Sequence, residues 1–244
     1  MHRFYADERG VTGDIAHLSP EDQQHALRVL RMKPGDPCQL FWQDGRYEAE
    51  IAAIEGGEVS VRVLRALPTT EPRLRVTLFQ GLPKADKMEL IVQKAVELGA
   101  ERIVPVAMSR CVVRLDERDA RKKQERWQKI AREASKQSGR CIQPEVEAPV
   151  AMQALSQRLA AFDAAIVPWE DAHTVSLTAV HRAHPEATRL AVVIGPEGGM
   201  SEQEIAAMQA AGCVPVTLGP RILRTETAGL CTLSALMCLY GDME

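Results

Sequence analysis

The 244-residue sequence predicts an α/β protein with a small β-barrel at its N-terminus and a larger domain built on a mostly parallel sheet. Three observations support this prediction. Short strand-like runs separated by turn dipeptides fill residues 37–66, strands and helices alternate from residue 74 onward, and a polar, proline-rich stretch at 67–72 separates the two patterns. We therefore expect one domain over residues 1–70 and a second over residues 73–244.

The N-terminal domain is predicted from two hairpin signals and one short helix. Asp-Gly at 44–45 and Gly-Gly at 56–57 separate runs of partly alternating polarity, and both dipeptides are typical of hairpin turns. A helix is expected to begin after Ser19 and to end near the Lys-Pro-Gly sequence at 33–35. Three or four short strands with one small helix indicate a small barrel.

The C-terminal domain is predicted from apolar runs that alternate with helical patterns. The expected strands are residues 74–81, 102–108, 164–168, 190–195 and 214–219, and the expected helices are residues 86–98, 119–138, 201–211 and 225–240. The last three strands are almost uninterrupted in their apolar character, which is typical of strands buried on both faces of a parallel sheet. Asp86 and Glu89 have capping-box spacing, and Gly99 suits the position after the helix end.

Composition and cysteine spacing exclude several classes of protein. Apolar residues make up 45% and charged residues 26% of the chain, close to the globular average, and no apolar stretch is long enough to span a bilayer. The first ten residues carry charges rather than the apolar core of a signal peptide, so we expect a cytoplasmic protein. Six well-separated cysteines predict reduced thiols and no metal site, and Cys231 and Cys238 are expected in the core.

Positive charge is concentrated in residues 110–140, although the net charge of the chain is −3. On the helix expected there, the basic side chains lie on one face, opposite an apolar stripe that includes Trp127. Such a row suits a phosphate backbone, and a solvated helix face is the alternative. The residues expected to contact RNA are Arg28, Arg31, Arg110, Arg114, Lys122, Arg126, Lys129 and Arg140.

Two glycine-containing loops follow buried strands, at residues 195–199 and 218–228. Glycine lets a backbone approach a ligand closely, and open α/β sheets bind ligands beyond the carboxyl ends of their strands. An ordinary tight turn is the alternative for the first loop, and a local ion pair is the alternative for Arg224 and Glu226 in the second. The spacing matches neither a dinucleotide-binding fingerprint nor a P-loop.

The segments LAVVIGPEGGMSEQE (190–204) and VTLGPRILRTETAGL (216–230) closely resemble the RsmE-type family of ribosomal RNA uracil-N3 methyltransferases. Three further segments agree in order along the chain: HALRVLRMKPGD, KADKMELIVQKAVELGAERIVPV and RWQKIAREASKQSGRCIQPEVE. One departure is Lys136, where the family commonly has Glu. This substitution is expected to make the helix face more basic.

The resemblance implies an RNA-binding barrel similar to PUA domains, followed by a SPOUT methyltransferase domain with a deep trefoil knot. It also implies a homodimer, S-adenosylmethionine as methyl donor, and 16S ribosomal RNA or the assembled small subunit as substrate. The apolar helix at 228–240 is expected to be buried on every side, partly by a second subunit. The residues that would hold the donor are Pro168, Gly195, Pro196, Glu197, Gly198, Gly199, Leu218, Gly219, Ile222, Leu223, Arg224, Thr225, Thr227 and Ala228.

Methyl transfer to uridine N3 requires that the proton on N3 be removed before or during the attack. Glu226 can accept that proton, or Arg224 can stabilise the uridine anion. Gly198 is expected to have no room for a Cβ because the donor approaches it. Two other classes stay open: another SPOUT RNA methyltransferase, acting on ribose 2′-O or another base, and a non-catalytic RNA-binding protein of ribosome assembly.

Overall fold

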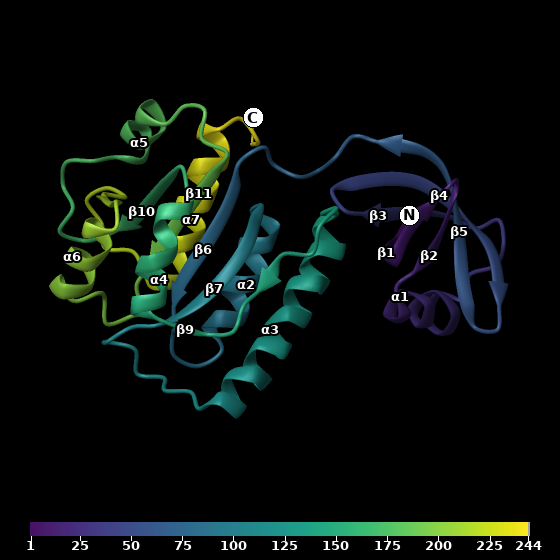
Figure 1. Cartoon of the computed structure of the whole chain (residues 1–244), viewed down its shortest axis with the longest axis horizontal. Helices are drawn as coiled ribbons and strands as arrows, with labels where there is room; N and C mark the ends of the chain where they lie inside the picture. Colours follow the sequence, from purple (N-terminus) through teal and green to yellow (C-terminus); the bar gives the residue numbers. More distant parts are fainter. Residues whose placement is uncertain (244) are drawn as a thin grey trace. The chain divides into compact units, whose positions relative to one another are not determined.

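Contacts within the chain divide it into two compact units. The computed structural model describes residues 1–243 (Figure 1). The first unit comprises residues 1–71 together with residues 135–142, and the second comprises residues 72–134 and the chain from residue 143 onward. The sequence predicted an uninterrupted first domain ending at residue 70, so the contribution of residues 135–142 to that unit was not anticipated.

The first unit is a closed five-stranded barrel in the order β1-β2-β5-β4-β3. Its strands are β1 (His2–Thr12), β2 (Ile15–Leu18), β3 (Pro37–Trp42), β4 (Gly45–Glu55) and β5 (Glu58–Leu67). Strands β1 and β3 pair in parallel, and the other pairs are antiparallel. Alternate residues of each strand point inward, so Phe4, Leu40 and Ile51 fill the interior. The two predicted hairpin turns are present, whereas strands β1 and β2 were not predicted.

A short helical segment crosses between β2 and β3. Helix α1 (Pro20–Gln24) begins after Ser19, whose hydroxyl accepts a hydrogen bond from the amide of Asp22 at 3.3 Å. The π-helical turn η1 (His25–Leu30) continues it and ends where Arg31 adopts a left-handed conformation with φ of 54°. The helix thus begins where the sequence predicted and ends slightly earlier.

The second unit is built on a seven-stranded parallel sheet in the order β12-β10-β11-β6-β7-β8, with β9 also paired to β7. The strands are β6 (Arg75–Gly81), β7 (Ala100–Ala107), β8 (Glu145–Val146), β9 (Val150–Ala151), β10 (Ala164–Pro168), β11 (Arg189–Ile194) and β12 (Cys213–Val216). The predicted strands are all present, and the alternation with helices that predicted a parallel sheet is confirmed.

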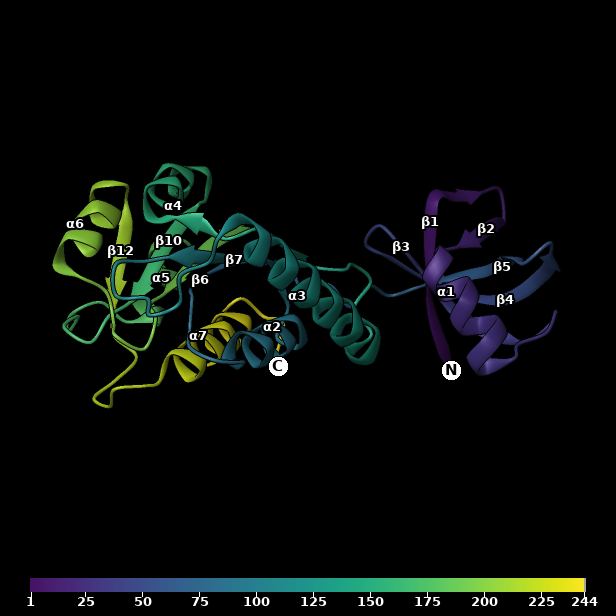
Figure 2. The same ribbon diagram turned by 90° about the horizontal axis from the view of Figure 1, so that it is seen from below.

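Helices cover both faces of this sheet. They are α2 (Lys87–Glu97), α3 (Glu117–Ser138), α4 (Met152–Arg158) with the 3-10 turn η2 (Leu159–Ala161), α5 (Leu177–Ala183), α6 (Glu202–Ala210) and α7 (Thr225–Leu239). Helices α2 and α7 pack together on one face, and α4 lies on the opposite face (Figure 2). No helix in residues 1–243 is long and apolar enough to cross a membrane.

Two local predictions about these helices differ in outcome. Ser201 and Glu204 form the capping box at the start of α6. The capping box expected at Asp86 is absent, because Asp86 has φ of −93° and ψ of 12° instead of the extended backbone that lets an N-cap side chain reach back. Gly99 follows α2 with φ of +87°, as its position after the helix suggested.

The prediction that Cys231 and Cys238 lie in the core is wrong, because both are exposed in this chain. Helix α7 turns a different face inward, formed by Thr225, Gly229, Thr232, Leu233, Leu236 and Met237. The helix is apolar almost all round, so its periodicity did not show which face packs against the sheet. The structure thus rules out complete burial of the helix within one chain, the alternative to partial cover by a second subunit.

Candidate active site

Five loops meet at the carboxyl-terminal edge of the sheet. Strand pairing places the last residues of neighbouring strands side by side: Gly81 pairs with Val106, Gln80 with Ile194, and Pro168 with Val216. The segments that follow these strands therefore share one edge, where ligands bind in open α/β sheets. Both predicted glycine loops belong to this group.

The first glycine loop, residues 195–199, is a tight turn with close neighbours. The amide of Gly199 donates to the carbonyl of Pro196 at 2.9 Å, and Gly199 has φ of +70°. A Cβ built on Gly81 would lie 2.7 Å from the nitrogen and Cδ of Pro196. The loop therefore rests directly on the backbone at the end of β6.

Gly198 is small for a reason that the sequence did not reveal. A Cβ at this position would lie 3.1 Å from Cβ and 3.2 Å from the carbonyl oxygen of Arg110, in the segment after β7. The Arg110 guanidinium also donates to the carbonyl of Gly198 at 3.2 Å. The expectation that a donor molecule excludes a Cβ here is corrected, because the protein's own chain occupies that space.

The segment that carries Arg110 is itself anchored to the same edge. Glu204, in the first turn of α6, accepts hydrogen bonds from the amide and hydroxyl of Ser109 at 2.7 and 2.9 Å, and from the amide of Ser201 at 2.9 Å. Burial by itself raises the pKa of Glu204, but these hydrogen bonds outweigh it and hold the pKa below its ordinary value. Glu204 thus fastens the segment after β7 to the start of α6.

The second glycine loop joins β12 to α7 and is more open. Gly219 has φ of +101°, and its amide donates to the Thr217 hydroxyl at 3.1 Å. Ile222 is 87% exposed, an unusual position for a large apolar side chain. Arg224 occupies the N-cap position of α7 and is exposed. The loop therefore presents one apolar and one cationic side chain outward.

Two adjoining hollows lie between these loops. The smaller, of about 160 Å³, is bordered by Trp169, His173 and the second loop. The larger, of about 420 Å³, is bordered by Lys87, Arg224 and the first loop. The lining residues common to both hollows are Pro168, Glu170, Ile222, Leu223 and Ala228. Together they form a bent site of a size that suits a small molecule.

The residues predicted to hold a donor border these hollows, with one exception. Thr227 lines neither of the two and is exposed on α7. The sequence did not single out Lys87, Glu170 or His173, all of which line a hollow. Their positions next to strand ends are the only signal that the sequence offers for them. Arg221, which also lines a hollow, lies within the predicted loop 218–228 but was not assigned to the donor.

A three-residue ion cluster connects the first loop to α7. The Lys87 ammonium lies 2.9 Å from Oε1 of Glu197 and 3.4 Å from Oε2 of Glu226. The hydrogen bond to Glu197 is the main cause that raises the pKa of Lys87. Burial by itself raises the pKa of Glu197, but hydrogen bonds from Lys87 and the Lys84 amide leave it below its ordinary value. Lys87 and Glu197 therefore stay ionised at neutral pH.

Arg224 and Glu226 are placed differently with respect to the hollows. Arg224 lines the larger one, whereas Glu226 lines neither. The local ion pair considered for these two residues is not present in the described part of the chain, where Glu226 pairs with Lys87 instead. Only Arg224 of the two is in direct reach of a molecule in the site.

Comparison with known proteins identifies both units. A sequence model described as an RNA methyltransferase domain matches residues 70–237, and one described as an RNA methyltransferase PUA domain matches residues 18–64. The chain is 40% identical over 228 residues to the ribosomal RNA small subunit methyltransferase E of Bacillus subtilis, covering 90% of this chain and 88% of that protein. The chain belongs to the ribosomal RNA small subunit methyltransferase E family.

Solved structures of similar proteins agree with this assignment. One is a ribosomal RNA small subunit methyltransferase E from Neisseria gonorrhoeae bound to S-adenosylmethionine, 35% identical with a TM-score of 0.83 and full coverage of both chains. Another is a Legionella pneumophila methyltransferase in complex with the same cofactor, 34% identical with a TM-score of 0.79, covering 97% of this chain and 96% of that one. The predicted fold class, a PUA barrel followed by an α/β methyltransferase domain, is confirmed. The trefoil threading stays a prediction.

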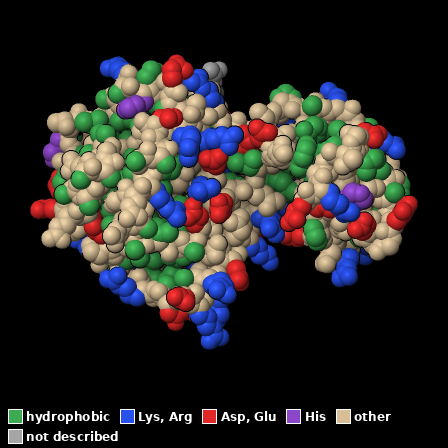
Figure 3. Space-filling model, in the orientation of Figure 1, with side chains coloured by type: hydrophobic (Ala, Val, Ile, Leu, Met, Phe, Trp, Pro, Cys, Tyr) green, Lys and Arg blue, Asp and Glu red, His purple; other side chains and the backbone are tan. Residues whose placement is uncertain are grey.

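The basic residues proposed to contact RNA, apart from Arg140, lie on α3, on the barrel and in the segment after β7. Lys122 and Lys129 are exposed on α3, whose positive side chains are interspersed with acidic ones in the view of Figure 3. Arg126 is also exposed but pairs with Glu89 of α2 at 2.6 Å. Arg28 and Arg31 are exposed on the barrel, and Arg110 and Arg114 are exposed after β7, each with one hydrogen bond to a backbone carbonyl.

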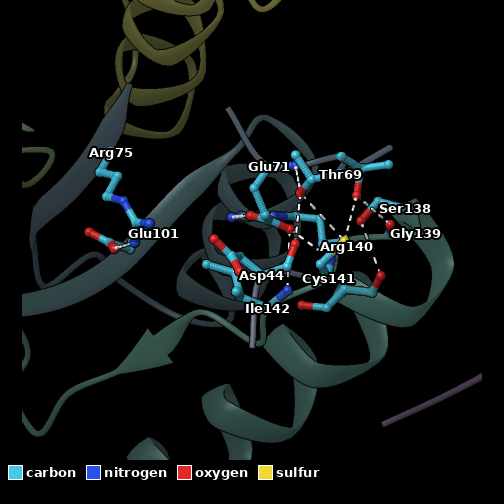
Figure 4. Close-up of polar contacts among 12 residues, drawn as sticks. Asp44, Thr69, Glu71, Arg75, Glu101, Ser138, Gly139, Arg140, Cys141 and Ile142 are labelled. Atoms are coloured by element: carbon cyan, nitrogen blue, oxygen red, sulfur yellow. Dashed lines mark hydrogen bonds and ion pairs between the residues drawn. The ribbon is translucent and has the colours of Figure 1, made fainter. Parts of the chain in front are cut away.

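Arg140 is wrongly assigned to RNA contact, because it is only 4% exposed. Its guanidinium pairs with the carboxylate of Glu71, with Nε 3.1 Å from Oε2, and Glu71 also accepts from the amide of Cys141 at 2.7 Å (Figure 4). A buried charge is stable only when it is paired in this way. Arg140 is therefore a structural residue of the first unit.

Lys136 does not make the helix face more basic. Its ammonium lies 2.7 Å from Oδ1 of Asp22, which is 1% exposed and also accepts from the amide of Tyr5 at 2.7 Å. The positive charge neutralises a buried carboxylate of the barrel. The departure from the family pattern at this position is thus matched by a partner in the same unit.

Proposed function

We propose that this protein transfers the methyl group of S-adenosylmethionine to N3 of a specific uridine in 16S ribosomal RNA. The observation that carries the proposal is the bent site at the carboxyl-terminal sheet edge, bordered by both glycine loops. It is supported by membership of the family and by relatives that bind S-adenosylmethionine at 34–35% identity. No group of three or more potential metal ligands occurs in the described residues.

The chain's own residues fit the donor without a metal. Backbone of the two loops at 195–199 and 217–219 borders the hollows, and Leu218, Ile222 and Leu223 supply apolar contacts. When bound, S-adenosylmethionine supplies an activated methyl group on a sulfonium. The task left to the protein is to hold two reactants in line and to keep water out.

The proton on uridine N3 is the remaining chemical requirement. Arg224 lines the larger hollow and is exposed, so it can donate to the uracil oxygens and stabilise the anion that forms when N3 loses its proton. Glu226 lies two residues further along, in the first turn of α7, and pairs with Lys87, which lines the same hollow. We propose Arg224 as the catalytic residue that touches the base. Glu226 stays our candidate acceptor of the N3 proton and, because it lines neither hollow, would receive that proton through a bridging water.

Methylation assays test this proposal directly. The protein is incubated with S-adenosylmethionine carrying a tritiated methyl group and either naked 16S RNA or small subunits from a strain that lacks the modification. The expected product after digestion to nucleosides is N3-methyluridine. Arg224→Ala should retain donor binding by calorimetry and lose most methyl transfer, and Arg182→Ala, an exposed residue of α5 outside both hollows, serves as the control.

The products also separate the alternatives. A 2′-O-methylated nucleoside would assign the protein to a ribose methyltransferase class instead. Failure to bind S-adenosylmethionine would leave a non-catalytic RNA-binding protein of ribosome assembly. Because its proposed substrate is the ribosome and its cysteines are free, we place the protein in the cytoplasm.

We also propose that a second copy covers the exposed face of α7. Cys231, Cys238 and Thr227 are exposed on that helix, and Leu90 of the adjoining α2 is 45% exposed. A twofold dimer buries one such face against another. Light scattering should give the mass of a dimer, and Cys231→Glu should give a monomer, with Gln209→Glu on the exposed side of α6 as the matched control. A monomeric wild-type protein at micromolar concentration would contradict the proposal.

A further inference from the structure

Two linked hydrogen bonds connect the first glycine loop with the residue that follows the second. The side-chain amide of Gln80, at the end of β6, donates to the hydroxyl of Thr225 at 2.9 Å, and this hydroxyl donates to the carbonyl of Gly195 at 2.6 Å. Gln80 is 0% exposed and Thr225 is 6% exposed. The bond between Gln80 and Thr225 is therefore shielded from water, and the bond between Thr225 and Gly195 is partly shielded, at the edge of the hollow.

The hydrogen bonds can run in only one direction. The Gly195 carbonyl can only accept, so the single hydroxyl proton of Thr225 is committed to it. Thr225 must then accept from Gln80, whose amide nitrogen also donates to the carbonyl of Gly81 at 3.0 Å. Turning the Gln80 amide over would set its oxygen against that carbonyl. The relay therefore requires a donor at position 80 and a hydroxyl at position 225.

The three residues belong to three separate elements, and two of them, Gly195 and Thr225, line the larger hollow, whereas Gln80 lies behind Thr225. Gly195 opens the first glycine loop, Thr225 is the first residue of α7 directly after the second loop, and Gln80 is the penultimate residue of β6. The relay thus sets the distance between the two loops.

Gln80 is retained at a cost. Its side-chain oxygen is buried and has no hydrogen-bond partner among the described residues. An unpaired acceptor in a core is unfavourable, so a position that tolerates one calls for an explanation. The two hydrogen bonds that the amide nitrogen of Gln80 donates, to Thr225 and to the Gly81 carbonyl, provide that explanation.

We propose that Gln80 and Thr225 are positioning residues that hold the two loops at the spacing required by the methyl donor. Thr225 acts through its grip on the Gly195 carbonyl instead of through a hydroxyl contact to the donor. Gln80 makes no contact with the donor and acts through Thr225. This inference rests on the proposed function, because it assumes that the hollow binds S-adenosylmethionine.

The first test uses isosteric changes at position 225. Thr225→Val keeps the shape and removes the hydroxyl, and Thr225→Ser keeps the hydroxyl. Thr232→Val is the matched control, since Thr232 is also buried on α7 and its hydroxyl donates to the Ala228 carbonyl of the same helix. By calorimetry, Thr225→Val should bind S-adenosylmethionine and S-adenosylhomocysteine at least tenfold more weakly. Thr225→Ser should stay within about threefold of the wild type, and Thr232→Val should match it.

The second test addresses Gln80 and the coupling between the two residues. Gln80→Met preserves length and volume and removes the donor, so it should weaken binding by a similar factor. Combining it with Thr225→Val should weaken binding little further, because both changes break the same relay. All variants are checked for cooperative thermal unfolding, and Gln80→Met decides the matter if Thr225→Val does not fold.

The outcomes distinguish this inference from the proposed function. A wild-type protein that does not bind S-adenosylmethionine overturns the proposed function. Wild-type binding with unchanged affinity in Thr225→Val or Gln80→Met overturns the relay alone. Equal losses in Thr225→Val and Thr232→Val would also overturn it, because the effect would then come from a loosened helix. Additive losses in the double variant would show that the two side chains act separately.

Discussion

Replacing Gly81 with alanine tests whether close packing against β6 holds the first glycine loop. The new Cβ would lie 2.7 Å from both the nitrogen and Cδ of Pro196 and 3.0 Å from the carbonyl carbon of Gly195. The obstructing atoms are backbone and a rigid ring, so several tenths of an ångström of relief must come from moving the loop itself. Such overpacking costs about 1–3 kcal/mol.

The expected result is a lower melting temperature together with weaker donor binding. For a domain of this size about 1 kcal/mol corresponds to about 2–4 °C, so Gly81→Ala should melt about 2–12 °C below the wild type. Calorimetry should also show loss of S-adenosylmethionine affinity, because the loop is displaced from the hollow that it borders.

Gly229→Ala is the matched control for this experiment. Its Cβ would make ordinary contacts of 3.6 Å with Gln80 and Ile194, and alanine favours the helix by up to about 1 kcal/mol. This variant should therefore melt at or slightly above the wild-type temperature and bind the donor normally. The reasoning is refuted if Gly81→Ala melts and binds like the wild type, or if Gly229→Ala loses as much as Gly81→Ala.

Three further predictions follow from contacts in the two units. Lys136→Glu sets a second carboxylate beside buried Asp22 and should destabilise the first unit by about 3–5 kcal/mol, measured by urea unfolding, and adding Asp22→Asn should restore part of the loss. Replacing Lys122 and Lys129 with alanine should reduce the log–log salt slope of RNA binding by about two units without changing donor affinity, and an unchanged slope would make this face a solvated surface. Hydrogen bonds hold the pKa of Glu204 below its ordinary value of 4.5 despite burial, so the folded state binds this proton less readily than the unfolded state. The contribution of the Glu204 carboxylate to folding stability is therefore present above about pH 4.5 and is lost as the pH falls. The stability difference between wild type and Glu204→Gln should shrink as the pH falls below about 4.5, and a pH-independent difference would contradict this.

The sequence was informative where a function is encoded within a few neighbouring residues. Both glycine loops were found because Gly and Pro follow apolar strands directly, and parallel strands bring their carboxyl ends to one edge. The capping box at Ser201 was found for the same reason, since its two members are three residues apart. Five of the seven strands of the sheet were predicted because buried parallel strands are apolar throughout, whereas β8 and β9, of two residues each, were not predicted.

Contacts between distant positions were not accessible in this way. Lys87 meets Glu197 and Glu226 only after the sheet has assembled, and no local pattern links them. Gly198 must be small because Arg110, 88 positions earlier in the chain, lies against it. No local pattern shows this contact, so the sequence alone suggested that the methyl donor excludes a Cβ there.

The helical wheel of α3 failed for a more specific reason. It gave the direction of Lys136 but not its surroundings, because the chain from residue 135 to 142 belongs to the first unit. It does not apply to Arg140, because α3 ends at Ser138 and Gly139 has φ of +79°. The basic residues are therefore exposed near the start of the helix, as at Lys122. At and just beyond its C-terminal end they pair with the carboxylates of Asp22 and Glu71. Charge patterns predict the side of a helix, and burial depends on what that side meets.

The interrupted first unit has a consequence for biosynthesis. A chain made from its N-terminus completes all five barrel strands before residues 135–142 exist. Until then, the carboxylates of Asp22 and Glu71 lack their cationic partners Lys136 and Arg140. The Tyr5 hydroxyl also lacks the Arg140 carbonyl to which it donates a hydrogen bond. The buried charges of the nascent barrel therefore stay incompletely paired while α2, β7 and most of α3 are translated. The charge pairing inside the first unit is thereby completed only after part of the second unit has been made, so a chain that ends before residue 135 would leave Asp22 and Glu71 without these cations.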